Sequence, residues 1–482
     1  MSRKKTRRQV LQDGAVLAAL PLLARCTPSP TDPTPTDAGP PVRPTTNPDV
    51  DGARDVAFNP SAAPQDTLNF PLPVQAGAAE ATAVTFWCYV ANGSPVTLRV
   101  WRPSTTTGNA MVAHEETLSP VEGYVKLRVT TLAPDTLYSY GFFTALDAAR
   151  SGLGQVRTAW PPGYRWPLTL AATTCTNWRY RPYTALERTA QEDVDLLCHL
   201  GDMTYCDGAM TQNQYRALWR ENLADPGYQA LLPKAGSCIV WDDHEFTNDF
   251  NPERLDQGVM AAARAAFFET TPMEPGPQGQ LWRSFRWGDT AEVILLDCRT
   301  ERLPSTLATP PAQYMSTAQM AFLKQTLQES PCHFKVILNS VPMTNFPDTF
   351  WANSNDRWEG YTAAREEILT FLEQNNLDNV WFLSGDFHLG FVARLETSGF
   401  RRQLFDVAVG PGGNQGNPLP GLAMGSAELA EEIFPADQFL YWRGNIAMTL
   451  LTFDPLRDEV RIRFVDAATN ETLFDQVVSR RS

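Results

Sequence analysis

Apolar and polar residues alternate with a period of two over residues 66–160, as at Val84, Phe86, Cys88 and Val90. This alternation is typical of β-strands that bury one face and expose the other. The sequence of this segment contains no cluster of ionisable residues. We therefore expect a small β-sandwich domain at 66–160 whose role is packing and spacing.

The segment at 131–143, TLAPDTLYSYGFF, narrows the expected type of sandwich. It resembles the penultimate strand of fibronectin-type and immunoglobulin-like domains, in which a tyrosine hydroxyl fixes the preceding corner. We expect the same corner here.

The pattern changes after residue 163, where short apolar runs are separated by stretches of helical periodicity. Strands and helices in alternation predict an α/β domain over residues 161–482 with largely covered sheets. Residues 439–478 have the pattern of a closing β-hairpin. The apolar runs lie at 167–175, 195–202, 237–245, 292–299, 335–340 and 379–388, and helices are expected at 183–194, 256–268, 316–329 and 360–374.

Residues 1–26 combine a basic start with a short apolar stretch at 15–24. That stretch is too short to cross a bilayer as a mature helix, so a cleaved signal is the better interpretation. Residues 6–11, TRRQVL, match the twin-arginine pattern that directs folded proteins to export. We expect the twin-arginine export machinery as a partner, and a protein that is periplasmic, secreted or held at a membrane.

A linker is expected over residues 27–65, because the sequence as far as about Asp55 is rich in Pro, Thr and Asp. Such a segment cannot bury enough surface to fold and predicts an extended tether. Cys26, just before it, stands where a lipoprotein carries its acylated cysteine, although Arg25 replaces the small residue usual there. The sequence therefore leaves a lipid anchor at Cys26 open.

The chain is acidic, with 40 Lys and Arg against 54 Asp and Glu and a formal net charge of −14. An acidic surface repels nucleic acid and anionic membranes, so we expect no nucleic-acid partner. Eight cysteines in 482 residues are too few for a disulfide scaffold.

Four of the apolar runs end in a carboxylate: Asp202, Asp242 with Asp243, Asp297 and Asp386. Ligands of α/β sheets gather at the carboxyl ends of the strands, so these groups can converge. Clustered carboxylates repel one another unless a cation neutralises them, and oxygen ligands select hard cations. Metal ions would thus supply the positive charge that this acidic cluster requires.

Only five histidines are present, which excludes a site built mainly from imidazoles. His114 lies in the expected sandwich and His199 lies within a strand, so both are interpreted as structural. A metal centre here must use Asp, with Tyr and Cys as further candidates and at most two His ligands.

Five motifs, in order along the chain, are similar to those of PhoD-like alkaline phosphatases and phosphodiesterases. They are LGDMTY at 200–205, VWDDHEFTNDF at 240–250, LLDCRTER at 295–302, DRWEGYTAARE at 356–366 and LSGDFHLGF at 383–391. The resemblance covers about residues 66–482. It implies a metallophosphoesterase fold, a four-layer αββα sandwich, preceded by the small β-sandwich.

The resemblance also implies a dinuclear metal centre. Its ferric ion (Fe³⁺) would be bound by Cys175, Asp202, Tyr205 and Asp386, with Asp202 bridging to a second ion. That ion is usually Ca²⁺ in the family, and another divalent metal is an alternative. Asp243 and Asn248 match positions of this second centre, and His388 matches the last histidine of the superfamily's Gly-His-x-His motif.

The implied reaction is hydrolysis of phosphate monoesters or diesters by a hydroxide held on the metals. His244 is the candidate for protonating the leaving oxygen, with Asp243 and His388 beside it in the catalytic set. The chain departs from the family at Cys298 and at Asn339-Ser340, which affects the expected substrate pocket.

Two other classes of protein are weighed against this interpretation. A surface-tethered, non-catalytic binding protein with a phosphatase-like fold would have lost some of the implied ligands, yet all are present. A carboxylate-based glycosidase would need two carboxylates and no Tyr or Cys partner. We expect a monomeric enzyme acting on a phosphate ester.

Overall fold

The computed structural model describes residues 48–104, 109–307, 312–346 and 354–479. The expected signal at 1–26, Cys26 and most of the linker lie outside these residues. Within the described part, no helix has the length and apolar character needed to cross a membrane.

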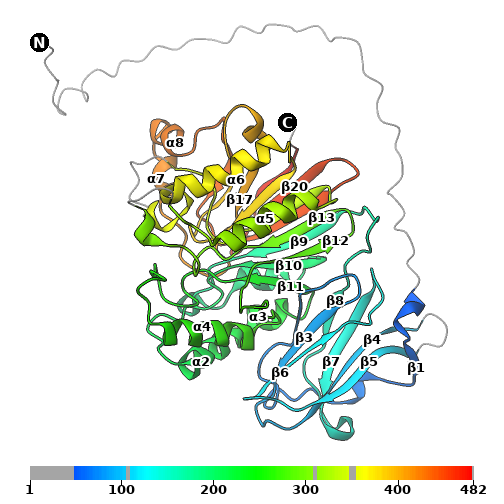
Figure 1. The fold of residues 1–482 in the computed structure, drawn as a ribbon. Coiled ribbons are helices and arrows are strands. Elements are labelled where there is room, and N and C mark those ends of the chain that lie inside the picture. Colours follow the sequence, from blue (N-terminus) through cyan, green and yellow to red (C-terminus); the bar gives the residue numbers. More distant parts are fainter. Residues whose placement is uncertain (1–47, 105–108, 308–311, 347–353, 480–482) are drawn as a thin grey trace, which may run out of the picture. The chain divides into compact units, whose positions relative to one another are not determined.

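A nine-stranded sheet forms one half of the α/β region (Figure 1). Its central strands β9, β10 and β11 are parallel, with Leu196 of β10 opposite Leu170 and Gly236. The strands in spatial order are β21 (Thr472–Val478), β20 (Glu459–Asp466), β19 (Ala447–Asp454), β9 (Leu168–Thr173), β10 (Leu196–Leu200), β11 (Gly236–Val240), β2 (Gln75–Gly77), β3 (Val84–Tyr89) and β6 (Tyr124–Val129).

A seven-stranded sheet forms the other half, and its central strands β13, β14, β15 and β17 are parallel. The strands in spatial order are β12 (Arg283–Trp287), β13 (Ala291–Leu295), β14 (Phe334–Leu338), β15 (Val380–Ser384), β17 (Phe405–Ala408), β16 (Gly390–Arg394) and β18 (Phe439–Arg443).

The two sheets pack face to face through apolar side chains. Trp381 of β15 meets Phe453 of β19 with ring centroids 5.9 Å apart. Side chains alternate between the faces of a strand, so Val293 points into the core shared by the sheets while Ile294 joins a separate core with α5 and α6. On the other sheet, Tyr228 of α3 packs against His199 of β10. The order is therefore helix, sheet, sheet, helix, a mixed α/β fold.

The helices agree in part with the sequence pattern. Those expected at 256–268, 316–329 and 360–374 are present, whereas the one expected at 183–194 ends after six residues because the chain turns toward β10. The helices are α1 (Thr184–Thr189), α2 (Gln212–Leu223), α3 (Pro226–Leu231), α4 (Gln257–Thr270), α5 (Thr317–Glu329), α6 (Thr362–Gln374), α7 (Leu419–Met424) and α8 (Ala427–Ile433).

The N-terminal strands lie in two sheets that share a core, in which Phe86 of β3 meets Tyr140 of β7 at 4.9 Å between ring centroids. The Tyr138 hydroxyl accepts a hydrogen bond from the Ala133 N–H at 2.9 Å, the corner contact expected from the sequence. The second of these sheets contains β1 (Arg54–Val56), β5 (Ala110–Leu118), β4 (Val96–Pro103), β7 (Leu137–Phe143) and β8 (Gly154–Arg157).

The first of these N-terminal sheets does not end at the expected domain boundary. Strands β2, β3 and β6 continue the nine-stranded sheet, with Gly77 of β2 opposite Ser237 of β11. The described residues from 48 to 479 belong to one compact unit. A domain boundary at residue 160 stays a prediction, and this sheet passes across it.

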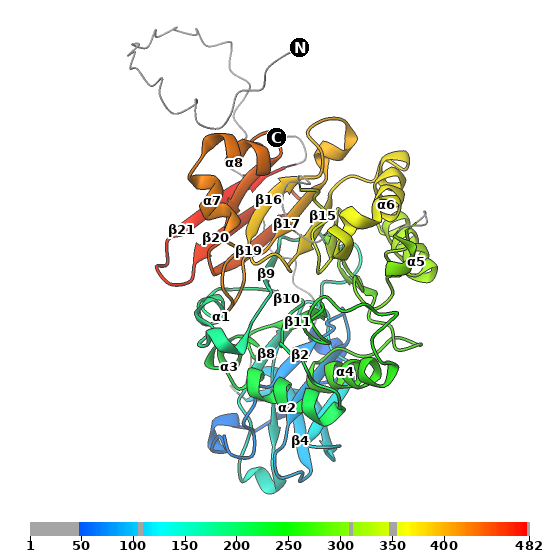
Figure 2. The ribbon, with the colours of Figure 1, turned by 90° about the vertical axis from the view of Figure 1, so that its left-hand side faces the viewer.

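The C-terminal segment differs from the expected closing hairpin. Strand β18 pairs with β16 of the seven-stranded sheet, while β19, β20 and β21 form an antiparallel edge of the nine-stranded sheet (Figure 2). Each strand of this segment buries at least one face against a core, so the segment connects the two sheets.

Candidate metal centre

The predicted ligands lie just beyond the carboxyl ends of parallel strands in both sheets. Cys175 follows β9, Asp202 follows β10, and Asp243 follows β11 of the nine-stranded sheet. Asp386 and His388 follow β15 of the seven-stranded sheet. Because the two sheets face each other, their strand ends bring these residues to one place.

Four of these residues have a left-handed backbone conformation. The φ angles are 53° at Cys175, 55° at Asp202, 64° at Asp386 and 52° at His388. Residues other than glycine seldom adopt positive φ, and such strain gathers at functional sites. Of the fourteen described non-glycine residues with positive φ, four are therefore candidate ligands that follow central strands of the two sheets.

Two glycines allow the ligand turns to approach their neighbours. A Cβ on Gly201 would lie 2.4 Å from the Cβ of Asp242, and one on Gly385 would lie 2.2 Å from Thr174 Oγ1. The Gly-Asp pairs at 201–202 and 385–386 are therefore required by close packing as well as by chemistry.

Ligand atoms of Cys175, Asp202 and His388 lie within 4.8 Å of one another. The Tyr205 hydroxyl lies 3.2 Å from Asp202 Oδ2 and 3.2 Å from His388 Nε2, and Cys175 Sγ lies 3.5 Å from Asp202 Oδ2. These four side chains could surround one ion.

A second group shares a member with the first. Ligand atoms of Asp202, Asp243 and His244 also lie within 4.8 Å of one another. Asp202 is only 2% exposed and belongs to both groups, as the expected bridging role requires.

Asp386 stands beside this pair of groups and contacts a cation of the protein itself. Its Oδ1 accepts a hydrogen bond from Arg299 Nη2 at 2.7 Å. The same fully buried guanidinium forms ion pairs with Asp242 and Asp356. The structure groups His388 with Cys175 and Asp202, whereas the ligand atoms of Asp386 lie within 4.8 Å of those of Asp242 and Asp243. The role of Asp386 as a ligand of the first ion stays a prediction.

Asn248 lies at the edge of the centre. It is exposed, its side chain donates to Asp249 at 3.1 Å, and its N–H donates to Asp207 at 2.7 Å. The N–H of Asp249 in turn donates to Asp243 Oδ2 at 2.6 Å. These contacts fix the loop that carries Asp243, and the role of Asn248 as a ligand stays a prediction.

Glu245 is a residue that the sequence reasoning missed. Its carboxylate accepts hydrogen bonds from the N–H groups of Asp202 and Asp242, at 3.0 and 2.8 Å, and from that of Met203. It is 1% exposed and joins the turns after β10 and β11. The only signal for it in the sequence is its place at the end of the run WDDHE, where a buried acid follows the ligands.

Burial sets the protonation of the candidate ligands when no cation is bound. Burial and the charge of Asp202 raise the pKa of Cys175 and of Tyr205 well above their ordinary values. Burial raises the pKa of Asp386 to about 8 and lowers the pKa of His388 to about 4. These residues fit a cation, since its charge stabilises their anionic or neutral donor forms.

The pKa of His244 moves in the opposite direction from that of His388. Burial by itself lowers it, but the charge of Asp202, the hydrogen bond to Asp207 and the charge of Asp243 raise it to about 10. The Nδ1 atom lies 2.7 Å from Asp207 Oδ2. The ring of His244 lies within the second group, but a protonated imidazole has no free nitrogen for a cation, so His244 is placed to hold a proton while Asp202 and Asp243 offer the donor atoms.

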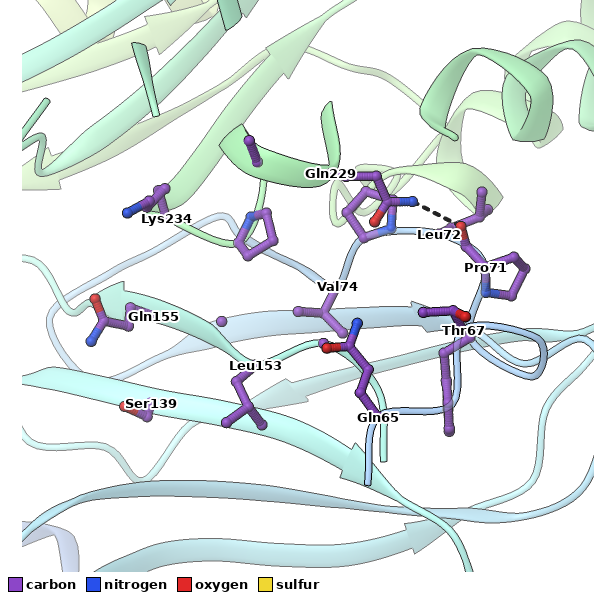
Figure 3. A pocket seen from close by; sticks show the side chains of 16 residues that line it. Gln65, Thr67, Pro71, Leu72, Val74, Ser139, Leu153, Gln155, Gln229 and Lys234 are labelled. Carbon is purple, nitrogen blue, oxygen red and sulfur yellow. Dashed lines mark hydrogen bonds between the residues drawn. The ribbon is translucent and has the colours of Figure 1, made fainter. Parts of the chain in front are cut away.

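A cavity of about 730 Å³ opens onto this centre, and Tyr205, His244 and His388 form part of its wall. Another cavity of about 620 Å³ lies between the N-terminal strands and α3 (Figure 3). Gln65, Gln155 and Lys234 are among its polar residues, and its lining contains no Asp, Glu, His or Cys. Of these two cavities, only the first has side chains in its wall that can bind a metal ion.

The two departures from the family pattern contact each other behind the centre. The thiol of Cys298 donates to Asn339 Oδ1 at 2.8 Å, and the Ser340 hydroxyl donates to Asp242 Oδ1 at 2.8 Å. All three residues 298, 339 and 340 are buried. They support the acidic cluster and do not line the cavity at the metal ligands.

Comparisons with known proteins identify a family for this chain. The family model of PhoD-like phosphatases matches residues 170–411, half of the chain. Alkaline phosphatase D of Bacillus subtilis (strain 168) is 27% identical over 317 residues, which are 56% of this chain and 54% of that protein. The chain therefore spans about half the length of this curated relative.

Two solved structures share the fold. A structure of PhoD has a TM-score of 0.72 at 21% identity and covers 86% of this chain and 90% of its own. Purple acid phosphatase PPD1 from yellow lupin (Lupinus luteus) seeds has a TM-score of 0.60 at 13% identity and covers 85% of this chain and 75% of its own.

The raised pKa values predict that metal binding releases protons. At pH 7 the metal-free Cys175 and Tyr205 hold their protons, so Zn²⁺ added to the metal-free protein should displace about two protons or more per chain. Titration calorimetry in buffers of different ionisation enthalpy measures this number. Cys175→Ser should lower it by about one, and affinity should rise with pH. Binding without proton release would contradict the ligand assignment.

Proposed function

The chain belongs to the PhoD-like phosphatase family, and from this membership and the geometry of the acidic centre we propose that it hydrolyses phosphate esters. The observation that carries the proposal is the buried Asp202, which belongs to two neighbouring groups of ligand atoms. A carboxylate shared in this way suits a dinuclear centre.

The donor set supports different ions at the two positions. Thiolate, phenolate and carboxylate at Cys175, Tyr205 and Asp202 are anionic donors that suit Fe³⁺, and the oxygen ligands around Asp243 suit Ca²⁺ or another divalent ion. When bound, the ions supply positive charge for the phosphoryl oxygens and an activated water.

Hydrolysis requires a proton for the leaving oxygen, and a residue of the chain can donate it. One P–O bond breaks, the phosphorus gains the oxygen of a water molecule, and the departing oxygen must gain a proton. His244 lines the cavity, and its Nδ1 is fixed by Asp207 at 2.7 Å. We assign the proton delivered to the leaving oxygen to this imidazole.

Hydrolysis of 4-nitrophenyl phosphate and of bis(4-nitrophenyl) phosphate tests the function directly. The purified protein should release nitrophenol from at least one of them, lose this activity after chelation, and regain it when metal is restored. A protein that keeps its metals, binds phosphate and hydrolyses neither ester would instead be the non-catalytic binding protein with a phosphatase-like fold.

The role of His244 predicts a dependence on the leaving group. His244→Asn should lower kcat by roughly 100-fold or more for an alkyl phosphate, whose alkoxide needs a proton, and much less for 4-nitrophenyl phosphate. The control His114→Asn changes a histidine of β5 and should alter neither rate. Equal losses with both esters would assign His244 a positioning role.

We also propose export through the twin-arginine route, because the sequence at 6–11 carries the paired Arg7 and Arg8. Replacing both by Lys should leave activity in the cytoplasm, whereas the control Arg3→Lys should be exported normally. Cell fractionation followed by the nitrophenyl assay measures the distribution. Normal export of the double variant would refute this route.

A further inference from the structure

The outer wall of the cavity at the metal centre carries exposed aromatic residues. The short 3₁₀ turn Trp178–Tyr180 contributes all three of its residues to the lining. Trp178 is 40% exposed and Tyr180 is 42% exposed. Aromatic rings that line a cavity beside a polar centre offer a ligand both apolar surface and a π-face.

The turn is held in place by contacts on both sides. The Asn177 side chain accepts a hydrogen bond from the Arg179 N–H at 3.1 Å, and the Asn177 N–H donates to the Gly413 carbonyl at 2.9 Å. The Tyr180 hydroxyl donates to Gln415 Oε1 at 3.3 Å. Because Asn177 lies two residues after Cys175, the turn is joined closely to the candidate metal ligands.

The charge of this wall differs from that of the acidic chain. The guanidinium carbons of Arg179 and Arg181 each lie 5.8 Å from the centre of the Trp178 ring. Arg181 pairs with Glu221 at 3.8 Å, whereas no carboxylate of the described residues lies within ion-pair distance of Arg179. A guanidinium that lies near the Trp178 ring and has no acidic partner can stack on a flat, electron-rich group.

We propose that Trp178, Arg179 and Tyr180 bind a flat aromatic group on the alcohol part of the ester, such as the base of a nucleoside. Stacking on aromatic side chains tolerates any base, because every base has a π-face. The preferred substrates are then phosphate esters of nucleosides or similar ring-bearing alcohols, and not esters of simple polyols.

This inference rests on the proposed hydrolysis and adds no chemical step to it. Water supplies the oxygen that joins phosphorus, the P–O bond to the nucleoside breaks, and the nucleoside oxygen takes the proton assigned to His244. The aromatic wall contacts only the departing alcohol. Its contribution should therefore appear in substrate binding more than in the rate of bond breaking.

Adenosine 5′-phosphate and ribose 5-phosphate form a matched pair for the test, because both release a primary ribose alcohol and only one carries a base. The metal-loaded enzyme should show a KM at least about tenfold lower for the nucleotide. Trp178→Ala should raise the nucleotide KM by about tenfold with little change in kcat, and Trp178→Phe should restore most of the loss. Neither variant should change the constants for ribose 5-phosphate.

The control Leu456→Ala removes an exposed apolar side chain in the turn between β19 and β20 and should change nothing. Equal KM values for the two esters, or a nucleotide KM that does not respond to Trp178→Ala, would overturn the inference while leaving the hydrolase function intact.

Binding of adenosine, which carries no phosphate, separates the two proposals. Saturation transfer from the protein to the base protons of adenosine, followed by NMR, should be present in the wild type and weaker in Trp178→Ala. If the enzyme hydrolyses neither ester, the proposed function is refuted. If adenosine still gives a signal that depends on Trp178, the proposed aromatic binding site is nevertheless supported. Absence of that signal as well would overturn both.

Discussion

Repulsion among buried carboxylates is the constraint on which the rest of the site depends. Asp202, Asp242, Asp243 and Asp386 meet where parallel strands of two sheets end, and all are withdrawn from water. Removing like charges from water costs free energy unless positive charge is supplied. Arg299 supplies part of this positive charge, because it forms ion pairs with Asp242 and Asp386. The contribution is only partial, because Arg299 makes no close contact with Asp202. The remaining demand falls on bound cations.

The same constraint explains why the surrounding backbone is strained. Left-handed conformations at the ligand turns are unfavourable, and they persist because their neighbours determine them. Glu245 accepts hydrogen bonds from the N–H groups of Asp202, Met203 and Thr204 in one of these turns and from that of Asp242 after β11. Gly201 and Gly385 are packed so closely that a Cβ at either position would overlap a neighbour. The sheets thus act as a rigid frame that keeps the donor groups together before any ion arrives.

The sequence predicted the central strands β9, β10, β11, β13, β14 and β15, because each is a short apolar run followed by a polar turn. It did not predict β12, β16 and β17. It missed α2, whose single apolar face of Tyr215, Trp219 and Leu223 is set among polar residues. It also could not show that β2 joins β11, because pairing between residues 77 and 237 depends on tertiary packing. Local sequence patterns indicate burial and turns, but they contain little information about the pairing of strands that are distant in the sequence.

The sequence likewise predicted only the part of the site that local motifs contain. Ligands that follow strands, such as Asp202 and Asp243, can be recognised from motifs, and the structure brings them together. The support from Glu245 and the ion pairs of Arg299 arise from contacts between distant segments. The aromatic wall at Trp178 looks like an ordinary loop in the sequence, and its exposure becomes informative only when the cavity is known.

The most direct test of the shared carboxylate is the metal content of Asp202→Asn, measured by mass spectrometry of the purified protein. The wild type should hold about two ions per chain, and the variant should lose ions from both positions because a neutral amide replaces the bridging charge. Asp289→Asn, a change in the turn between β12 and β13, serves as the control and should keep the wild-type content. Full metal occupancy in folded Asp202→Asn would contradict a centre built around this residue.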